Sequence, residues 1–199
     1  MLVPVDSEVV VIQPRKFWAR WRVRVGYAVA AVYWLLAAPT APSILIGALV
    51  AFLGLWIRGL ASGHLRKDET LATTGPYGLT RNPLYFGSAF LAAGFVVAGH
   101  SWPAGVIVSG YFAVFYYAVM RSEERDVRER FGVAFDEYAS RVPLFVPRLP
   151  RPSGRRAHPE NRFSWLQYRR NREYQALAGT IAGLAAVWLR MWIRALFGY

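Results

Sequence analysis

The chain has 199 residues, of which 55% are hydrophobic and 18% are charged, with a mean hydropathy of +0.22. With glycine counted and tyrosine left out, the apolar share is roughly 58%, above the about 45–50% of soluble domains, which argues against a soluble domain and a disordered chain. Cysteine is absent, which excludes disulfides and thiolate chemistry. The three histidines, His64, His100 and His158, lie too far apart in sequence to suggest a metal site, so we expect no metal.

Two long stretches carry no Asp, Glu, Lys or Arg: Val25 to Ile57 and Asn82 to Met120. As single helices they would measure roughly 50 and 58 Å, well beyond the ~30 Å hydrocarbon core of a bilayer. Each stretch must therefore turn back, and the breaks are expected at Pro39 to Pro42 and at Gly99 to Pro103. The pattern predicts four spans in two hairpins, near residues 24–38, 43–60, 84–99 and 103–120.

A fifth apolar stretch, Tyr174 to Leu189, is shorter and ends at Arg190 and Arg194. Two interpretations stay open: a span whose arginines snorkel outward, or a helix lying partly in the membrane interface. The expected fold is an all-α membrane protein with about five transmembrane helices, in two hairpins plus a C-terminal helix.

The basic residues are concentrated in three segments. Of the 24 Lys and Arg, segment 1–24 holds five, segment 58–81 holds four and segment 121–173 holds thirteen, whereas the two turns hold none. By the positive-inside rule, the N-terminus and both other basic segments are cytoplasmic. The formal charge of +12 thus needs no nucleic acid to account for it. We expect a multi-pass protein of a bacterial or archaeal plasma membrane, with the lipid bilayer as its partner.

The segment between the hairpins is rich in residues that restrict the backbone. Gly75-Pro76-Tyr77-Gly78 indicates a turn, and Asn82-Pro83 restrains the chain where the third span begins. A plain connector would account for the glycines and prolines. It accounts less well for an arginine, an asparagine and two tyrosines close together at a membrane surface, at Arg81, Asn82, Tyr77 and Tyr85.

After the fourth span, residues 121–142 are expected to continue as an amphipathic helix. Its apolar stripe, at Val127, Phe131, either Ala134 or Phe135, and Tyr138, has helical spacing and is most simply packing. Glu123 and Glu124 differ, because they lie within about one turn of the membrane core, where an ionisable group is a candidate for function. The other interpretation pairs them with neighbouring arginines on a solvated face.

These features predict five parts of the chain. They are a cytoplasmic N-terminal segment (1–22), a first transmembrane hairpin (23–60), a catalytic core with the second hairpin and the cytoplasmic helix (61–147), a Pro/Arg-rich linker (148–162) and a C-terminal helix (163–199).

Three blocks of sequence resemble the isoprenylcysteine carboxyl methyltransferase and phospholipid methyltransferase superfamily of integral membrane methyltransferases. They read LATTGPYGLTRNPLYFG at 71–87, EE at 123–124 and FGVAFDEYASRVPLFVP at 131–147. Their order, spacing and intervening apolar hairpin fit that family over roughly residues 45–147.

The resemblance implies that S-adenosylmethionine binds at the cytoplasmic ends of the helices and that a lipophilic acceptor arrives through the bilayer. Aromatic rings suit the cationic sulfonium, and a carboxylate suits the ammonium or the ribose hydroxyls. Transferred by position, the catalytic residues are Glu123, Asn82 and Arg81. The cofactor-binding residues are Glu69, Thr70, Leu71, Ala72, Tyr77, Asn82, Pro83, Leu84, Tyr85 and Glu123.

Two positions depart from the family pattern. The common Arg-His-Pro reads Arg81-Asn82-Pro83, so an amide replaces the histidine donor. Val119 stands where the prenylcysteine enzymes hold the substrate carboxylate with an arginine, which argues against a prenylcysteine acceptor. Arg121 and His64 are the remaining candidates for substrate contact.

The expected function is an S-adenosylmethionine-dependent membrane methyltransferase acting on a lipophilic or small acceptor. Two alternatives stay open: an NADPH-dependent membrane reductase of the related sterol reductase type, and a non-catalytic membrane module that keeps the scaffold. Binding of S-adenosylmethionine against NADPH would separate the first two, and binding without turnover would favour the third.

Overall fold

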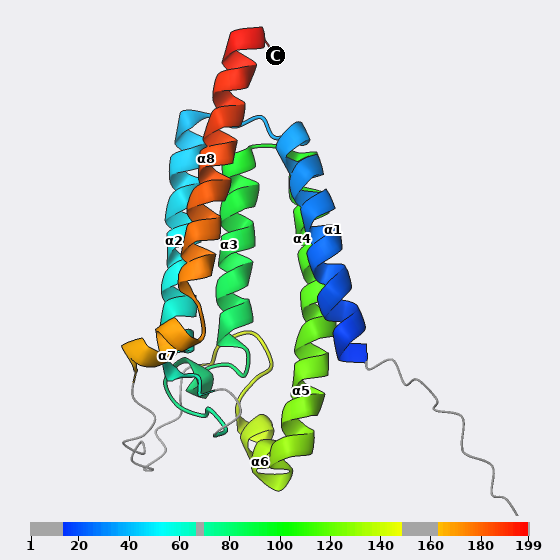
Figure 1. Cartoon of the computed structure of the whole chain (residues 1–199), viewed down its shortest axis with the longest axis vertical. Coiled ribbons are helices and arrows are strands. Elements are labelled where there is room, and N and C mark those ends of the chain that lie inside the picture. Colours follow the sequence, from blue (N-terminus) through cyan, green and yellow to red (C-terminus); the bar gives the residue numbers. More distant parts are fainter. Residues whose placement is uncertain (1–13, 67–69, 149–162, 199) are drawn as a thin grey trace, which may run out of the picture.

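The computed structural model describes residues 14–66, 70–148 and 163–198, with side chains from Trp21 onward, and its regular elements there are helical. The all-α membrane fold is confirmed (Figure 1). The elements in chain order are α1 (Pro14–Leu36), α2 (Ala41–His64), the short 3-10 turn η1 (Gly75–Gly78), α3 (Pro83–Gly99), α4 (Trp102–Tyr111), the π-helical segment η2 (Phe112–Tyr116), α5 (Tyr117–Phe131), α6 (Val133–Arg141), α7 (Trp165–Arg170) and α8 (Tyr174–Phe197).

Three helices are long and apolar enough to cross a membrane: α2, the continuous helix Trp102–Phe131 and α8. Helix α3 is apolar but only 17 residues long. Helix α1 begins at Pro14, before the first predicted span near residues 24–38, and its first half carries the basic residues of the N-terminal segment.

The two predicted turns lie together at one end of the molecule (Figure 1). Thr40 and Ser43 cap the start of α2 with reciprocal hydrogen bonds. Helix α3 ends at His100, whose φ of 44° is left-handed. The Ala38 amide donates to the Gly99 carbonyl (2.8 Å), which joins the turns. The end of α2 and the end of α5, with α6 and α7 and the basic residues that they carry, lie at the opposite end, called the basic end below.

The helices that are consecutive in the chain are not the ones that pack most closely. Helix α2 packs along α3, while α1 runs beside α4 (Figure 1), so the predicted first hairpin is not a packed pair. The α2–α3 seam is built on small residues. A Cβ at Gly54 would lie 2.6 Å from the Gly87 carbonyl oxygen, and one at Gly87 would lie 2.8 Å from the Gly54 carbonyl oxygen. Such close backbone approach is typical of membrane helix pairs.

Helix α8 extends beyond the predicted stretch, to Phe197, so that Arg190 and Arg194 lie within the helix. Arg190 does not snorkel away from the protein, because its Nη2 donates to the Leu35 carbonyl at the end of α1 (2.8 Å). At the basic end, the buried Glu173 pairs with Arg58 of α2 (Nε to Oε1 2.5 Å, Nη2 to Oε2 3.1 Å). The same guanidinium donates to Ser88 of α3. This cluster holds α2, α3 and the start of α8 together.

The helix predicted over 121–142 is two helices. Gly132 has φ of 50° and ψ of −125°, a backbone conformation that favours glycine, and it ends α5 and turns the chain into α6.

Residues 143–148, called the strap below, lie along residues 79–82. The Arg81 amide donates to the Pro143 carbonyl and the Arg148 amide donates to the Leu79 carbonyl (both 2.9 Å). The Thr80 hydroxyl donates to the Phe145 carbonyl (2.9 Å). Arg148, the first residue of the predicted linker, is thus joined to the folded core, and residues 149–162 lie outside the described part of the chain.

Candidate functional site

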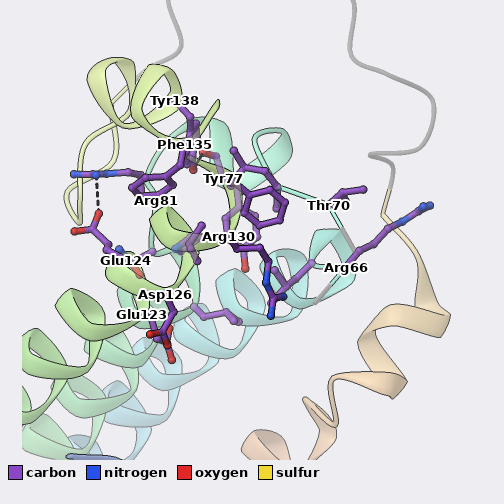
Figure 2. A pocket seen from close by; sticks show the side chains of 18 of the residues that line it. Arg66, Thr70, Tyr77, Arg81, Glu123, Glu124, Asp126, Arg130, Phe135 and Tyr138 are labelled. Atoms are coloured by element: carbon purple, nitrogen blue, oxygen red, sulfur yellow. Dashed lines mark hydrogen bonds and ion pairs between the residues drawn. The ribbon is translucent and has the colours of Figure 1, made fainter. Parts of the chain in front are cut away.

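A cavity of about 310 Å³ opens at the basic end, among the loop before α3, the first turn of α3, the last turns of α5 and helix α6 (Figure 2). This volume is at the lower end of the range for small-molecule sites. The residues around it are Leu65, Arg66, Thr70, Leu71, Ala72, Tyr77, Arg81, Asn82, Pro83, Leu84, Tyr85, Glu123, Glu124, Asp126, Val127, Arg130, Phe131, Phe135 and Tyr138.

Tyr77 is placed by the η1 turn and by α6. Gly75 starts that turn with φ of 59°, and a Cβ there would meet the His64 ring at 2.7 Å. The Tyr138 hydroxyl donates to the Tyr77 carbonyl (2.7 Å) in a buried contact. Burial raises the pKa of both phenols above their usual value. Both rings therefore stay neutral at physiological pH.

The two adjacent glutamates of α5 have different partners. Glu123 Oε1 accepts a hydrogen bond from the Tyr85 hydroxyl of α3 (2.7 Å). Glu124 forms ion pairs with Arg81 (2.6 Å) and with Arg121 (2.9 Å), and Figure 2 shows the Arg81 pair. The arginine pairing considered for both residues thus holds for Glu124, whereas the Glu123 carboxylate faces a tyrosine in the cavity wall.

Asn82 lies at the start of α3, next to Pro83, and is 9% exposed. Its side-chain Nδ2 donates to the Leu144 carbonyl of the strap (3.0 Å). The amide that replaces the family's histidine therefore fastens the strap to the first turn of α3, directly at the cavity.

Ten residues expected at the site from the sequence surround this single cavity: Thr70, Leu71, Ala72, Tyr77, Arg81, Asn82, Pro83, Leu84, Tyr85 and Glu123. Glu69 lies outside the described residues. Arg121 does not line the cavity; its side chain is 54% exposed and paired with Glu124. His64 does not line it either, because Nδ1 hydrogen-bonds to the Leu60 carbonyl (2.8 Å) and the ring packs on Phe163.

The sequence reasoning missed part of the α5 and α6 wall. Asp126, Arg130, Phe135 and Tyr138 line the cavity, although the aromatic pair was interpreted as packing alone. Helical spacing was the available signal, because residues three, four and seven positions after Glu123 share its face of the helix. In the parts of the chain that the structure describes, no group of three or more His, Asp or Glu could hold a metal ion.

Comparison with known proteins finds a family and several relatives. Residues 43–134 match the family described as phospholipid methyltransferase. The chain is 39% identical over 106 residues to the cobalt-zinc-cadmium resistance protein CzcN of Cupriavidus metallidurans, covering 53% of this chain and 48% of the relative. It is 36% identical over 139 residues to the nickel-cobalt-cadmium resistance protein NccN of Alcaligenes xylosoxydans xylosoxydans, covering 65% and 63%.

A third relative is named for an enzymatic activity. The chain is 32% identical over 104 residues to methanethiol S-methyltransferase 2 of Bradyrhizobium diazoefficiens, covering 51% of this chain and 35% of the relative. In each case the chain spans less than two thirds of the relative's length. No solved structure matches the chain significantly. All the residues that line the cavity except Phe135 and Tyr138 lie within the matched region, and over that region the chain is similar to the phospholipid methyltransferase family.

Proposed function

We propose that the chain is an integral membrane methyltransferase that binds S-adenosylmethionine in the cavity at the basic end and methylates a lipophilic or small acceptor. The observation that carries the proposal is the Glu123 carboxylate, held by the Tyr85 hydroxyl at 2.7 Å in a cavity that also presents the buried Tyr77 ring. A cavity with a carboxylate beside aromatic faces suits a small organic cation.

The cavity wall fits the parts of this cofactor. Glu123 would hold the ammonium or ribose hydroxyls, Leu71 and Leu84 would flank the adenine, and Tyr77 and Tyr85 would face the sulfonium. Bound there, S-adenosylmethionine supplies an activated methyl group. Alignment and exclusion of water are then the main tasks of the protein.

The chain's own residues set that alignment. The strap and Asn82 fix the first turn of α3, and the Tyr138 hydroxyl fixes the η1 turn. The Arg81–Glu124 pair joins residue 81 to α5. The methanethiol S-methyltransferase relative supports a thiol as one possible nucleophile class.

The proposed orientation puts the basic end, and with it the cofactor cavity, in the cytoplasm. The basic residues at the ends of α2 and α5 and on α6 and α7 lie at that end, as the positive-inside rule requires. A soluble cofactor would enter from the cytoplasm, and an apolar acceptor would enter between the helices.

The test is isothermal titration of the detergent-solubilised chain with S-adenosylmethionine, comparing Glu123→Gln with the control Glu129→Gln on the exposed face of the same helix. We expect Glu123→Gln to weaken binding more than about tenfold, because a charge-assisted bond is lost, and Glu129→Gln to leave the affinity unchanged. Unchanged affinity in both variants would refute the role of Glu123. Binding of NADPH instead would favour a reductase, and binding without methylated product from membrane extracts would favour a non-catalytic module.

A further inference from the structure

A second cavity, of about 510 Å³, lies among α1, α3, α4, η2 and α8, at the level of the membrane-spanning helices. Its wall is mostly apolar, with Ala92 and Phe95 on α3 and Val187 on α8. Tyr33 and Val187 of this wall also belong to a buried cluster with Ala98 and Ala104, which flank the turn between α3 and α4, at the end away from the cofactor cavity. A molecule in this cavity would therefore place its apolar body toward that cluster and its polar end toward the basic end.

The one charged side chain among the described residues of this wall is already neutralised. Arg58 pairs through two nitrogens with Glu173, and its third nitrogen donates to Ser88. Two of the wall hydroxyls are engaged within the protein, since Tyr33 donates to the Phe95 carbonyl (2.6 Å) and Tyr111 donates to the Arg22 carbonyl (2.8 Å). The body of the cavity thus has no free charge to offer a ligand.

Two tyrosines in contact with each other line one cavity each. Tyr85 lines the cofactor cavity and Tyr116 lines the second cavity, and their rings pack edge to face with centroids 5.6 Å apart. The π-helical segment η2 presents Tyr116 at this point, stacked on Phe112 at 4.2 Å. We call Tyr85 and Tyr116 the neck.

A cation stands at the neck. The Arg22 guanidinium of α1 lies over the Tyr116 ring, 5.8 Å from its centroid. Arg22 is one helical turn before Gly26, which lines the second cavity. Glu123 approaches the same Tyr85 hydroxyl from the cofactor side. The neck therefore has a carboxylate on the side of the cofactor cavity and a guanidinium close to the second cavity.

From this geometry we propose that the second cavity binds the methyl acceptor, and that the acceptor is an apolar molecule with one anionic group, such as a thiolate, phenolate or carboxylate, held by Arg22 at the neck. This proposal rests on the proposed function only in identifying the bound molecule as the methyl acceptor. Arg22 would face the anionic group of the acceptor, and Glu123, on the other side of the neck, would face the cationic cofactor. Arg22 on α1 would then supply the positive charge that is missing at Val119 on α5.

The test uses two photoreactive probes on the purified full chain in nanodiscs: the carboxylate derivative of trifluoromethyl phenyl diazirine, which is an anion at neutral pH, and its uncharged parent. Labelled peptides are mapped by mass spectrometry. We expect saturable labelling of the η2 peptide by both probes. Arg22→Gln should reduce labelling by the anionic probe about tenfold, because a charge-assisted contact is lost, and should leave the uncharged probe nearly unchanged.

Matched controls separate charge from space. Arg24→Gln removes an exposed cation of the same helix and should change neither probe. Ala92→Phe fills the cavity and should abolish saturable labelling by both probes, whereas Ala93→Phe, on the exposed side of α3, should not. Ala186→Phe with its control Ala185→Phe repeats this comparison on α8 if the α3 variant does not fold.

Two outcomes would overturn the proposal. If Arg22→Gln reduces labelling by both probes equally, or by neither, Arg22 does not hold the anion. If saturable labelling persists in both Ala92→Phe and Ala186→Phe, the ligand does not bind in this cavity. Titration of S-adenosylmethionine into the same samples keeps the two proposals apart. If the unmodified chain is labelled saturably but does not bind S-adenosylmethionine, the proposed function alone is refuted. If it binds S-adenosylmethionine but shows no saturable labelling, the acceptor site alone is refuted.

Discussion

Tyr77 contributes to the cofactor cavity through its ring, because its carbonyl is engaged by Tyr138 and its side chain is 7% exposed. We predict that Tyr77→Ala weakens binding of S-adenosylmethionine more than Tyr77→Phe, by about 1–2 kcal/mol if the ring faces the sulfonium. Isothermal titration of both variants is the measurement. Equal losses would instead make the hydroxyl the contact.

Asn82 fastens the strap rather than facing solvent. We predict that Asn82→Leu lowers the free energy of unfolding by about 1–3 kcal/mol, because the Leu144 carbonyl loses a buried donor. Asn82→His, which keeps a ring N–H, should lose less if the ring reaches that carbonyl. Thermal unfolding in detergent measures both variants, and a Leu variant as stable as the parent would contradict this role.

Among elements, the α2–α3 seam depends on backbone contact at Gly54 and Gly87. We predict that Gly54→Ala lowers the unfolding temperature, because its Cβ would lie 2.6 Å from a backbone oxygen that cannot move without separating the helices. Gly179→Ala is the matched control, since that Cβ would meet no atom within 4 Å. The control should be neutral or stabilising by roughly 0.5–1 kcal/mol, because alanine favours a helix over glycine. A seam variant as stable as the control would show that the helices tolerate wider spacing.

The sequence predicted the elements better than it predicted their partners. Charge-free runs and prolines located the turns, because burying charge in a bilayer is costly. Pairing of α2 with α3 could not be read in the same way, since it depends on which glycines face one another in three dimensions. The break at Gly132 and the Arg58–Glu173 pair depend likewise on tertiary contact. At the site, the quoted motif residues were brought together, whereas Arg22 lies far from them in sequence.

For the whole molecule, the proposed orientation can be measured directly because the chain has no cysteine. Single cysteines at Thr74 and Ser140 should react with a membrane-impermeant thiol reagent in inverted vesicles but not in intact cells. A cysteine at Ser101, the residue before α4 in the turn that follows α3, should react only in intact cells. Labelling of Thr74 from outside would reverse the orientation and the route of the cofactor.

The Arg58–Glu173 pair has a consequence for how the protein is made. Arg58 leaves the ribosome more than a hundred residues before its carboxylate partner, so during synthesis α2 must wait with an unneutralised guanidinium near the membrane surface. Until Glu173 has been synthesised, the Arg58 guanidinium has no carboxylate partner, so the partly assembled bundle carries an uncompensated positive charge. We expect Glu173→Gln to leave the Arg58 charge uncompensated and so to shorten the half-life of the protein in cells, measured by pulse-chase. The double variant Arg58→Gln with Glu173→Gln removes that charge and should regain part of the lost half-life.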